Sequence, residues 1–340
     1  MFDIGLAIPT CKEGLSSPVG FARPDQVIQI IRRAEELGYH SVWGNDHITA
    51  PQYAREAFAD PPNFYEPLTV LAAAAPVTST IRLAAAVLVL PLREPVFLAK
   101  QIATLDQFCG GRAMAAVGLG AYREEFERLH PRLKGARRGD MLDEGVEILH
   151  LLFTQREASF KGRYYEFDGI ELAPKPLQHP FPLFIGGNDA RAVSRAARWG
   201  QGWLPASIGL EGLTRGAEQL RQEAAALGRE PSELQVAPQM MAAIARTHEE
   251  AVRRFRESWM YQHLQSLAQS TLRHEDVSRL EERNLVGSPE EIIEQIRRMR
   301  EAGVTMLAAM NFVGAAVEDW LEQMQLFGEE VMPAFGSETT

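Results

Sequence analysis

The polar triplet Asn45-Asp46-His47 follows, after Gly44, a short apolar segment, residues 41–43, that is typical of a buried β-strand. Histidine titrates near neutral pH, so His47 could act as a general acid or base. The adjacent Asp46 could orient the imidazole or hydrogen-bond a ligand. A purely structural interpretation stays open, in which Asp46 caps a loop and His47 fills its base. We take Asp46 and His47 as the catalytic candidates.

Two glycine turns each stand between an apolar run and a helical segment. Gly118-Leu119-Gly120 follows residues 112–117, and Gly186-Gly187-Asn188-Asp189 follows residues 182–185. A buried strand, a glycine turn and an immediate helix leave backbone N–H groups at a helix N-terminus, which is a geometry that binds phosphate. The turns predict a phosphate-bearing cofactor or substrate, although a tight turn without a ligand would share the pattern. The dinucleotide motif G-x-G-x-x-G is not met, because Arg123 occupies its third glycine position.

Aromatic side chains near the predicted strand ends could line an apolar slot for a flat ring system. These residues are Trp43, Phe64, Tyr65, Tyr122 and Trp203. Most aromatic side chains of a barrel belong to its core, so we expect two or three of them at most to contact a ligand. Two further histidines, His263 and His274, lie in a polar segment and are expected at the surface.

The elements that must position these residues alternate between strand and helix along the whole chain. Eight candidate strands lie at residues 2–8, 41–43, 81–90, 112–117, 182–185, 202–205, 234–245 and 304–310. Each leads into a helical segment, and repeated strand–helix units form a parallel sheet buried on both faces. Eight units in this length favour a closed (β/α)8 TIM barrel over an open doubly wound sheet, with residues 1–340 as one domain.

Three segments interrupt this alternation. Residues 50–65 follow the second strand, residues 159–178 resemble a hairpin before the fifth strand, and residues 257–285 follow the seventh. Insertions in the loops that follow barrel strands cover the mouth of the active site. The substrate pocket is therefore expected beneath these insertions. The sequence pattern does not identify the substrate.

Composition narrows the class of protein. The chain of 340 residues has a net charge of −10 and a pI of about 5.4, so nucleic acid and anionic membranes are not expected partners. Its two cysteines, Cys11 and Cys109, offer neither a disulfide framework nor a zinc-spaced cluster, so we expect no metal and a reducing cytoplasm. We expect neither a signal peptide nor a membrane helix.

Taken together, these segments resemble the bacterial luciferase-like superfamily, and within it the branch that uses the deazaflavin coenzyme F420. The matching stretches are residues 34–43, 46–47, 85–92, 95, 105–112, 117–126, 138–149, 174–176, 185–187 and 202–203. The joint pattern is specific for the superfamily. It is much less specific for the cofactor, because members that use FMN share most of it.

The resemblance implies a barrel with the flavin ring across its mouth. The phosphate arm would be held by the turns after strands four and five, at Gly118, Gly120, Tyr122, Gly186, Gly187, Asn188 and Asp189. A non-prolyl cis peptide often ends the third strand against the ring, which here corresponds to Ala86, Val87 and Leu88. His47 would lie near the reactive face, and Trp43, Tyr65 and Trp203 are the expected substrate-pocket residues. Asn188 stands where many relatives have serine, which weakens the case for FMN.

The resemblance further implies an oxidoreductase that transfers hydride between the reduced deazaflavin and an organic substrate. Reduced FMN would instead activate dioxygen and make the enzyme a monooxygenase. A flavin-binding barrel without catalytic activity is the alternative of another class. The family commonly forms homodimers through helices near strands two and three, and the alanine-rich residues 71–76 would allow close helix approach.

Overall fold

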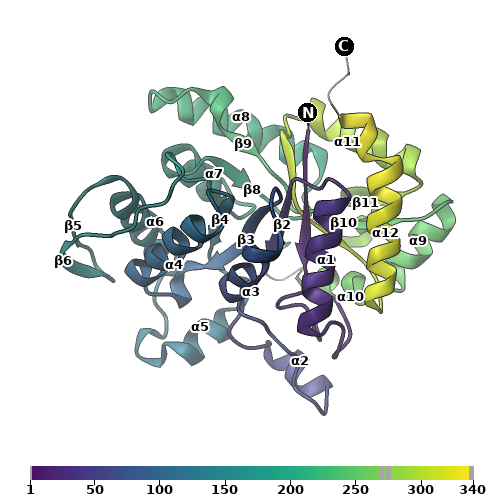
Figure 1. Ribbon diagram of the computed structural model, residues 1–340, viewed down its shortest axis with the longest axis horizontal. Coiled ribbons are helices and arrows are strands. Elements are labelled where there is room, and N and C mark those ends of the chain that lie inside the picture. The colour runs from purple at the N-terminus through teal and green to yellow at the C-terminus, as the bar shows by residue number, and fades with distance from the viewer. Residues whose placement is uncertain (1, 268–271, 273–276, 337–340) are drawn as a thin grey trace.

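The barrel strands are mainly apolar, because the chain covers both of their faces. The structure, a computed structural model, describes residues 2–267, 272 and 277–336 (Figure 1). The barrel strands are β1 (Asp3–Ile8), β2 (Ser41–Gly44), β3 (Arg82–Val89), β4 (Ala113–Gly118), β7 (Leu183–Gly186), β8 (Gly202–Leu204), β9 (Gln235–Val236), β10 (Met241–Ile244) and β12 (Met306–Phe312). They pair in parallel.

The sheet closes on itself. β12 pairs with β1 on one side and with β10 on the other, and β8 pairs with β9. β9 and β10 together form the seventh barrel strand, which is interrupted at Pro238. Across the interruption, the amides of Thr305 and Ala308 donate to Val236 O (3.0 Å) and Pro238 O (3.1 Å). The predicted (β/α)8 barrel is confirmed, with a break in one strand that the sequence pattern did not indicate.

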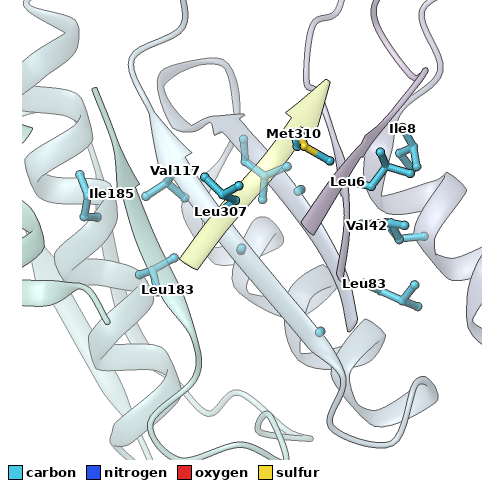
Figure 2. Packing of buried hydrophobic residues seen from close by; sticks show 14 of the residues in the cluster. Leu6, Ile8, Val42, Leu83, Val117, Leu183, Ile185, Leu307 and Met310 are labelled. Atoms are coloured by element: carbon cyan, nitrogen blue, oxygen red, sulfur yellow. The ribbon is translucent and has the colours of Figure 1, made fainter. Parts of the chain in front are cut away.

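An outer ring of helices covers the strands. It consists of α1 (Pro24–Glu36), α3 (Pro67–Ala74), α4 (Pro95–Phe108), α6 (Arg138–Thr154), α7 (Ala190–Trp199), α8 (Leu210–Ala226), α11 (Pro289–Glu301) and α12 (Val317–Glu330). Figure 1 shows α1, in purple, beside α12, in yellow, so the first and last helices of the ring are neighbours. Figure 2 shows the apolar layer between strands and helices, to which Leu6, Val42 and Ile185 contribute.

A different set of residues fills the inside of the barrel, because successive side chains of a strand point to opposite faces. Trp43 and Phe184 are the largest members, and their rings meet edge-on with centroids 5.8 Å apart. Most of the others are alanines, which leave room for the two rings. Gly5 does the same, since a Cβ there would lie 2.4 Å from Trp43 Nε1. This packing leaves the site to residues at and beyond the strand ends.

The remaining elements lie in the connections between the barrel strands and the helices of the ring. These are α2 (Gln52–Ala57), α5 (Arg123–Leu129), β5 (Ala158–Lys161), β6 (Glu166–Ile170), α9 (His248–Arg256), α10 (Trp259–Ser266) and β11 (Leu285–Gly287). β5 and β6 form the expected antiparallel hairpin, whereas the pairing of β11 with β10 was not expected. His274 lies outside the described residues. Within the described ranges, no helix has both the length and the apolarity to cross a bilayer.

Candidate active site

The carboxyl ends of the barrel strands open into a cavity of about 620 Å³. Residues that end or follow β2, β3, β4, β7 and β8 line it, and α10 adds His263 and Leu264. This is the end of the barrel at which enzymes of the architecture place their active sites. The structure brings Asp46, His47 and both glycine turns to this one cavity.

His47 is oriented by a carboxylate from another element. Its Nδ1 lies 2.9 Å from Glu125 Oε2 on α5, and Glu125 Oε1 accepts hydrogen bonds from the amides of Ile48 (2.6 Å) and Thr49 (3.2 Å). Glu125 is buried, which opposes its charge, yet the hydrogen bonds from His47 and the two amides hold its pKa below the ordinary value. A neutral His47 that donates from Nδ1 has its lone pair on Nε2, which can then exchange a proton with a ligand.

Asp46 does not orient His47, and this corrects the pairing expected from their adjacency. Its buried carboxylate accepts from Arg93 Nε (2.8 Å), from an Arg93 terminal nitrogen (2.7 Å) and from the amide of Val89 (2.9 Å). Arg93 also pairs with Glu66, and the two carboxylates raise its pKa although burial opposes the charge. Asp46 therefore fixes the end of β3 to the loop after β2, and the general acid–base candidate is His47 with Glu125.

Aromatic and imidazole rings surround His47. The rings of Tyr122 and Phe64 lie 5.4 and 6.0 Å from it, centroid to centroid. Tyr53 on α2 brings its hydroxyl to 3.3 Å from both Tyr122 Oη and His263 Nδ1. His263, expected at the surface, is half-buried and lines the cavity, where burial and the nearby His47 lower its pKa to about 3. α2 and α10 thus meet over the acid–base candidate.

Three aromatic residues that the sequence placed in the substrate pocket lie elsewhere. Trp43 is fully buried inside the barrel, where its Nε1 donates to Ser41 Oγ (2.8 Å). Trp203 is 1% exposed and donates to Gly187 O (2.7 Å) from beneath α8. Tyr65 packs against the outer core and donates to Ala22 O (3.4 Å). Packing and hydrogen bonds hold all three side chains away from the cavity. Of the predicted aromatic residues, only Tyr122 is among those lining the cavity.

The Val87 side chain, near the end of β3, lies against the glycine turns that follow β4 and β7. The peptide bond Ala86–Val87 is cis, as the resemblance implied, and both residues line the cavity. Leu88, the third expected residue, is instead buried in the outer core. A Cβ at Gly118 or Gly186 would lie 3.0 Å or 2.3 Å from a methyl carbon of Val87. These two glycines therefore make room for the Val87 side chain.

The other two glycines also serve the protein's own packing. Gly120 has φ +71°, and a Cβ there would lie 2.6 Å from Val89 Cγ1. Gly187 has φ +141°, and its Cβ would lie 2.9 Å from that of Ala192. Both turns line the cavity, but a bulky substitution would disturb the barrel before it met any ligand.

Side chains after β7 are engaged with the backbone. Asn188 Nδ2 donates to Ala206 O (3.0 Å), and the amide of Ala206 donates back to Asn188 Oδ1 (2.8 Å). Asp189 caps α7 by accepting from the amide of Ala192 (2.9 Å). Both residues line the cavity, so they shape this end of it while their side chains hold the loop.

A group of arginines, missed in the sequence, stands beside the glycine turns. Arg123, Arg138 and Arg195 line the cavity. Arg138 donates to Leu119 O (3.1 Å) and Gly120 O (3.2 Å), and its Nε is buried without a hydrogen-bond partner among the described residues. A buried guanidinium N–H without a partner is costly, and phosphate matches its geometry. The donors present therefore fit a phosphate-bearing cofactor.

Comparisons with known proteins agree on one family. A sequence profile described as luciferase-like monooxygenase matches residues 2–306. An FMNH2-dependent dimethylsulfone monooxygenase from Pseudomonas putida is 29% identical over 294 residues, which are 80% of this chain and 78% of that protein.

Solved structures share the fold at lower identity. A monooxygenase from Streptomyces bottropensis has a TM-score of 0.81 at 24% identity and covers 98% of this chain and 100% of its own. An F420-dependent secondary alcohol dehydrogenase in complex with an F420–acetone adduct has a TM-score of 0.78 at 23% identity and covers 99% of both chains.

Proposed function

Because this chain belongs to the luciferase-like monooxygenase family, a family of flavin-type oxidoreductases, we propose that it transfers hydride between coenzyme F420 and a small organic substrate. The observation that carries this proposal is the hydrogen bond between His47 and the buried Glu125, on the wall of the cavity that the glycine turns also line. An acid–base residue and an anion-binding end in one cavity suit a redox reaction that also moves a proton.

Arg138 and the two glycine turns would hold the phosphate-bearing arm of the cofactor. The unpartnered Nε of Arg138 and the neighbouring Arg123 supply positive charge there. Ala86 and Val87 would lie against the ring. The bound deazaflavin supplies hydride exchange at a ring carbon.

His47 would manage the proton that accompanies the hydride. When an alcohol is oxidised, its O–H proton passes to His47 Nε2, and Glu125 stabilises the resulting imidazolium through Nδ1. In the reverse direction the imidazolium returns the proton to a carbonyl oxygen. Tyr53 and Tyr122 would limit the access of water to this step, because their hydroxyls meet over the imidazole.

An FMNH2-dependent monooxygenase is the second candidate, and the relative from Pseudomonas putida favours it. Two features support F420 instead. The loop after β7 has Asn188 in place of a serine, and the asparagine side chain is bonded to Ala206. Hydride exchange with an alcohol or ketone also requires a group that takes up or releases a proton. His47 is placed for this proton transfer, and the Glu125 carboxylate is hydrogen-bonded to it.

Titration of the purified protein with each cofactor tests the proposal. Oxidised F420 and FMN, followed by ring absorbance, should bind with different affinities, F420 at least tenfold more tightly. A panel of secondary alcohols then tests reduction of bound F420. Tighter binding of FMN together with oxygen-dependent turnover would support the monooxygenase and overturn hydride transfer. Binding without turnover in either assay on broad substrate panels would favour the non-catalytic barrel.

We further propose a homodimer of one-domain chains, residues 1–340, in the cytoplasm. Leu71 is buried in its own core, but Ala72, Ala73 and Pro76 are exposed on the α3 side, and Phe97 on the adjacent α4 is 68% exposed. Small residues beside a large exposed ring suit a helix-to-helix interface. Both cysteines are free thiols, which suits a reducing compartment.

A further inference from the structure

Two side-chain amides on the cavity wall are not engaged by the protein. Asn45, after β2, and Gln239, between β9 and β10, both line the cavity. Neither side chain forms a hydrogen bond with any residue that the structure describes, and Asn45 Oδ1 is buried. The amide of Asn188 on the same wall is instead bonded to Ala206 through both its oxygen and its nitrogen. An unpaired buried acceptor is unfavourable, so we expect a ligand to supply the partner.

The alternation of the strands turns both amides toward the barrel axis. Trp43 lies inside the barrel, and Asn45 follows it by two residues, which is the repeat of one strand face. Ala237 and Gln239 have the same relation in the seventh barrel strand. No hydrogen bond holds either amide, so rotation about its terminal carbon–carbon bond can turn the oxygen or the nitrogen toward a ligand.

The backbone that carries each amide is held in place. Thr10 Oγ1 donates to Asn45 O (2.8 Å). The amide of Ser207 donates to Gln239 O (3.1 Å), and the amide of Gln239 donates to Pro205 O (2.7 Å). A ligand would therefore have to order the two side chains but not the chain that carries them, which favours binding.

Both amides lie across the mouth from the proposed phosphate end. β10, β12, β1 and β2 are consecutive in the eight-stranded barrel, and β4 and β7 stand opposite them. The two glycine turns follow β4 and β7. A phosphate held at those turns is therefore on the other side of the cavity, and Asn45 is on the same loop as His47.

The charged side chains that line this side of the cavity are already engaged. Asp46 is paired with Arg93, and His47 is hydrogen-bonded to Glu125. His263 is uncharged at neutral pH, because burial and the nearby His47 lower its pKa to about 3. A charged group of a ligand would meet no free counter-ion among these residues, whereas an uncharged group could pair with the amides.

We propose that Asn45 and Gln239 bind an uncharged carboxamide of the substrate. A carboxamide combines N–H donors with a carbonyl acceptor, which is the complement of a side-chain amide. The substrate class is then a small neutral alcohol or ketone that also carries a carboxamide. This inference rests on the proposed function, because it places the reacting group beside His47. The apolar part would lie against Leu264 and Met241, which line the same cavity.

Binding of matched six-carbon compounds tests the inference, with F420 or FMN present if the protein binds either. Hexanamide should bind at least tenfold more tightly than hexanoate, hexylamine or 1-hexanol, as measured by ligand-observed NMR titration. Asn45→Leu and Gln239→Leu should each weaken hexanamide binding at least tenfold. Asn45→Asp should also weaken it but strengthen binding of hexylamine, because the carboxylate is a counter-ion for the ammonium group. Gln222→Leu, at an exposed position of α8, is the matched control.

Equal affinity for hexanamide and any of the other three compounds, or full hexanamide affinity in either leucine variant, would overturn the inference. Circular dichroism checks that the variants are folded, which is expected of Asn45→Leu because it removes an unpaired buried acceptor.

Titration of the leucine variants with F420 separates the two claims. If they lose hexanamide but bind F420 as the wild type does, the carboxamide site stands. If they lose F420 affinity and keep hexanamide, the amides bind the cofactor and the inference falls. If the wild type binds neither F420 nor FMN, the proposed function fails, while the comparison of the six-carbon compounds still decides this site.

Discussion

His47 owes its orientation to a carboxylate 78 residues further along the chain, while the carboxylate next to it serves another partner. Asp46 and His47 are adjacent in sequence and lie on one loop, but their side chains do not hydrogen-bond to each other. Their side chains leave the loop in different directions, Asp46 toward Arg93 and His47 toward Glu125. The catalytic assignment is therefore tested most sharply at His47 and Glu125.

We expect His47→Gln to lower turnover by about 10²–10⁴-fold, because glutamine can hydrogen-bond but cannot transfer a proton. The glutamine amide can still donate to Glu125, so the melting temperature should stay near that of the wild type. His47→Ala should be as slow and also less stable, by about 1–3 kcal/mol, since Glu125 loses a partner. Steady-state kinetics and urea unfolding measure both effects. Full turnover in the glutamine variant would show that His47 only positions a ligand.

Arg138 is the residue at which cofactor affinity should be most sensitive. Arg138→Gln removes the charge beside the glycine turns and should weaken F420 binding at least tenfold, about 1.4 kcal/mol. The exposed Arg132→Gln in the same connection is the control and should bind as the wild type does. Ring absorbance gives both dissociation constants. Equal dissociation constants for the two variants would show that Arg138 does not bind the cofactor phosphate.

At the scale of elements, a single carboxylate fastens a loop to a helix. Glu35 Oε1 on α1 accepts from the amides of Ser79 (2.8 Å), Thr80 (2.6 Å) and Ile81 (2.9 Å), just before β3. Burial opposes the charge, but the three amides together lower the pKa of Glu35 to about 2. The folded state therefore favours the ionised form of the Glu35 carboxylate.

We expect Glu35→Gln to lose about 1–3 kcal/mol of stability at pH 7. A folded pKa of about 2 lies below the unfolded value, so the contribution is full above the unfolded pKa, near 4.5, and is lost as the pH falls toward 2. Urea unfolding at pH 7, 4 and 3 should show the difference between variant and wild type shrinking with pH. A constant difference over this range would mean that the ionised carboxylate is not what matters.

The sequence predicted elements better than it predicted side-chain directions. Strand and helix alternation sufficed for the barrel, for the hairpin and for the two turns at the cavity. Trp43 was misplaced because a three-residue strand segment does not reveal which face of the strand turns inward. Glu125, Arg138 and His263 were missed as site residues because their roles depend on contacts between distant segments, which no local pattern contains.

At the scale of the whole molecule, the exposed apolar residues of α3 and α4 bear on assembly. Phe97→Glu should convert the proposed dimer into a monomer of 37.8 kDa, because a charge in a closely packed helix interface is strongly disfavoured. Leu227→Glu, an exposed apolar residue after α8, should leave the dimer intact. Sedimentation velocity at micromolar concentration distinguishes the two. A monomeric wild type would refute the dimer.

The contact of Val87 with both glycine turns can be examined with a mutant cycle. Gly186→Ala alone should cost about 1–3 kcal/mol, because its Cβ would lie 2.3 Å from Val87 Cγ1. In a Val87→Ala background that methyl carbon is gone, and the same substitution should cost much less. Unfolding of the four proteins in the cycle gives the coupling energy. Additive effects would mean that the turn relaxes away from Val87.

This contact has a consequence for how the protein can vary over evolutionary time. Positions 87, 118 and 186 come from three strands, and they share one small volume. A larger residue at position 118 or 186 becomes acceptable only after residue 87 has been replaced by a smaller one, so the order in which mutations arise decides which are accessible. The three positions should therefore covary as a set among natural relatives and in libraries selected for folding.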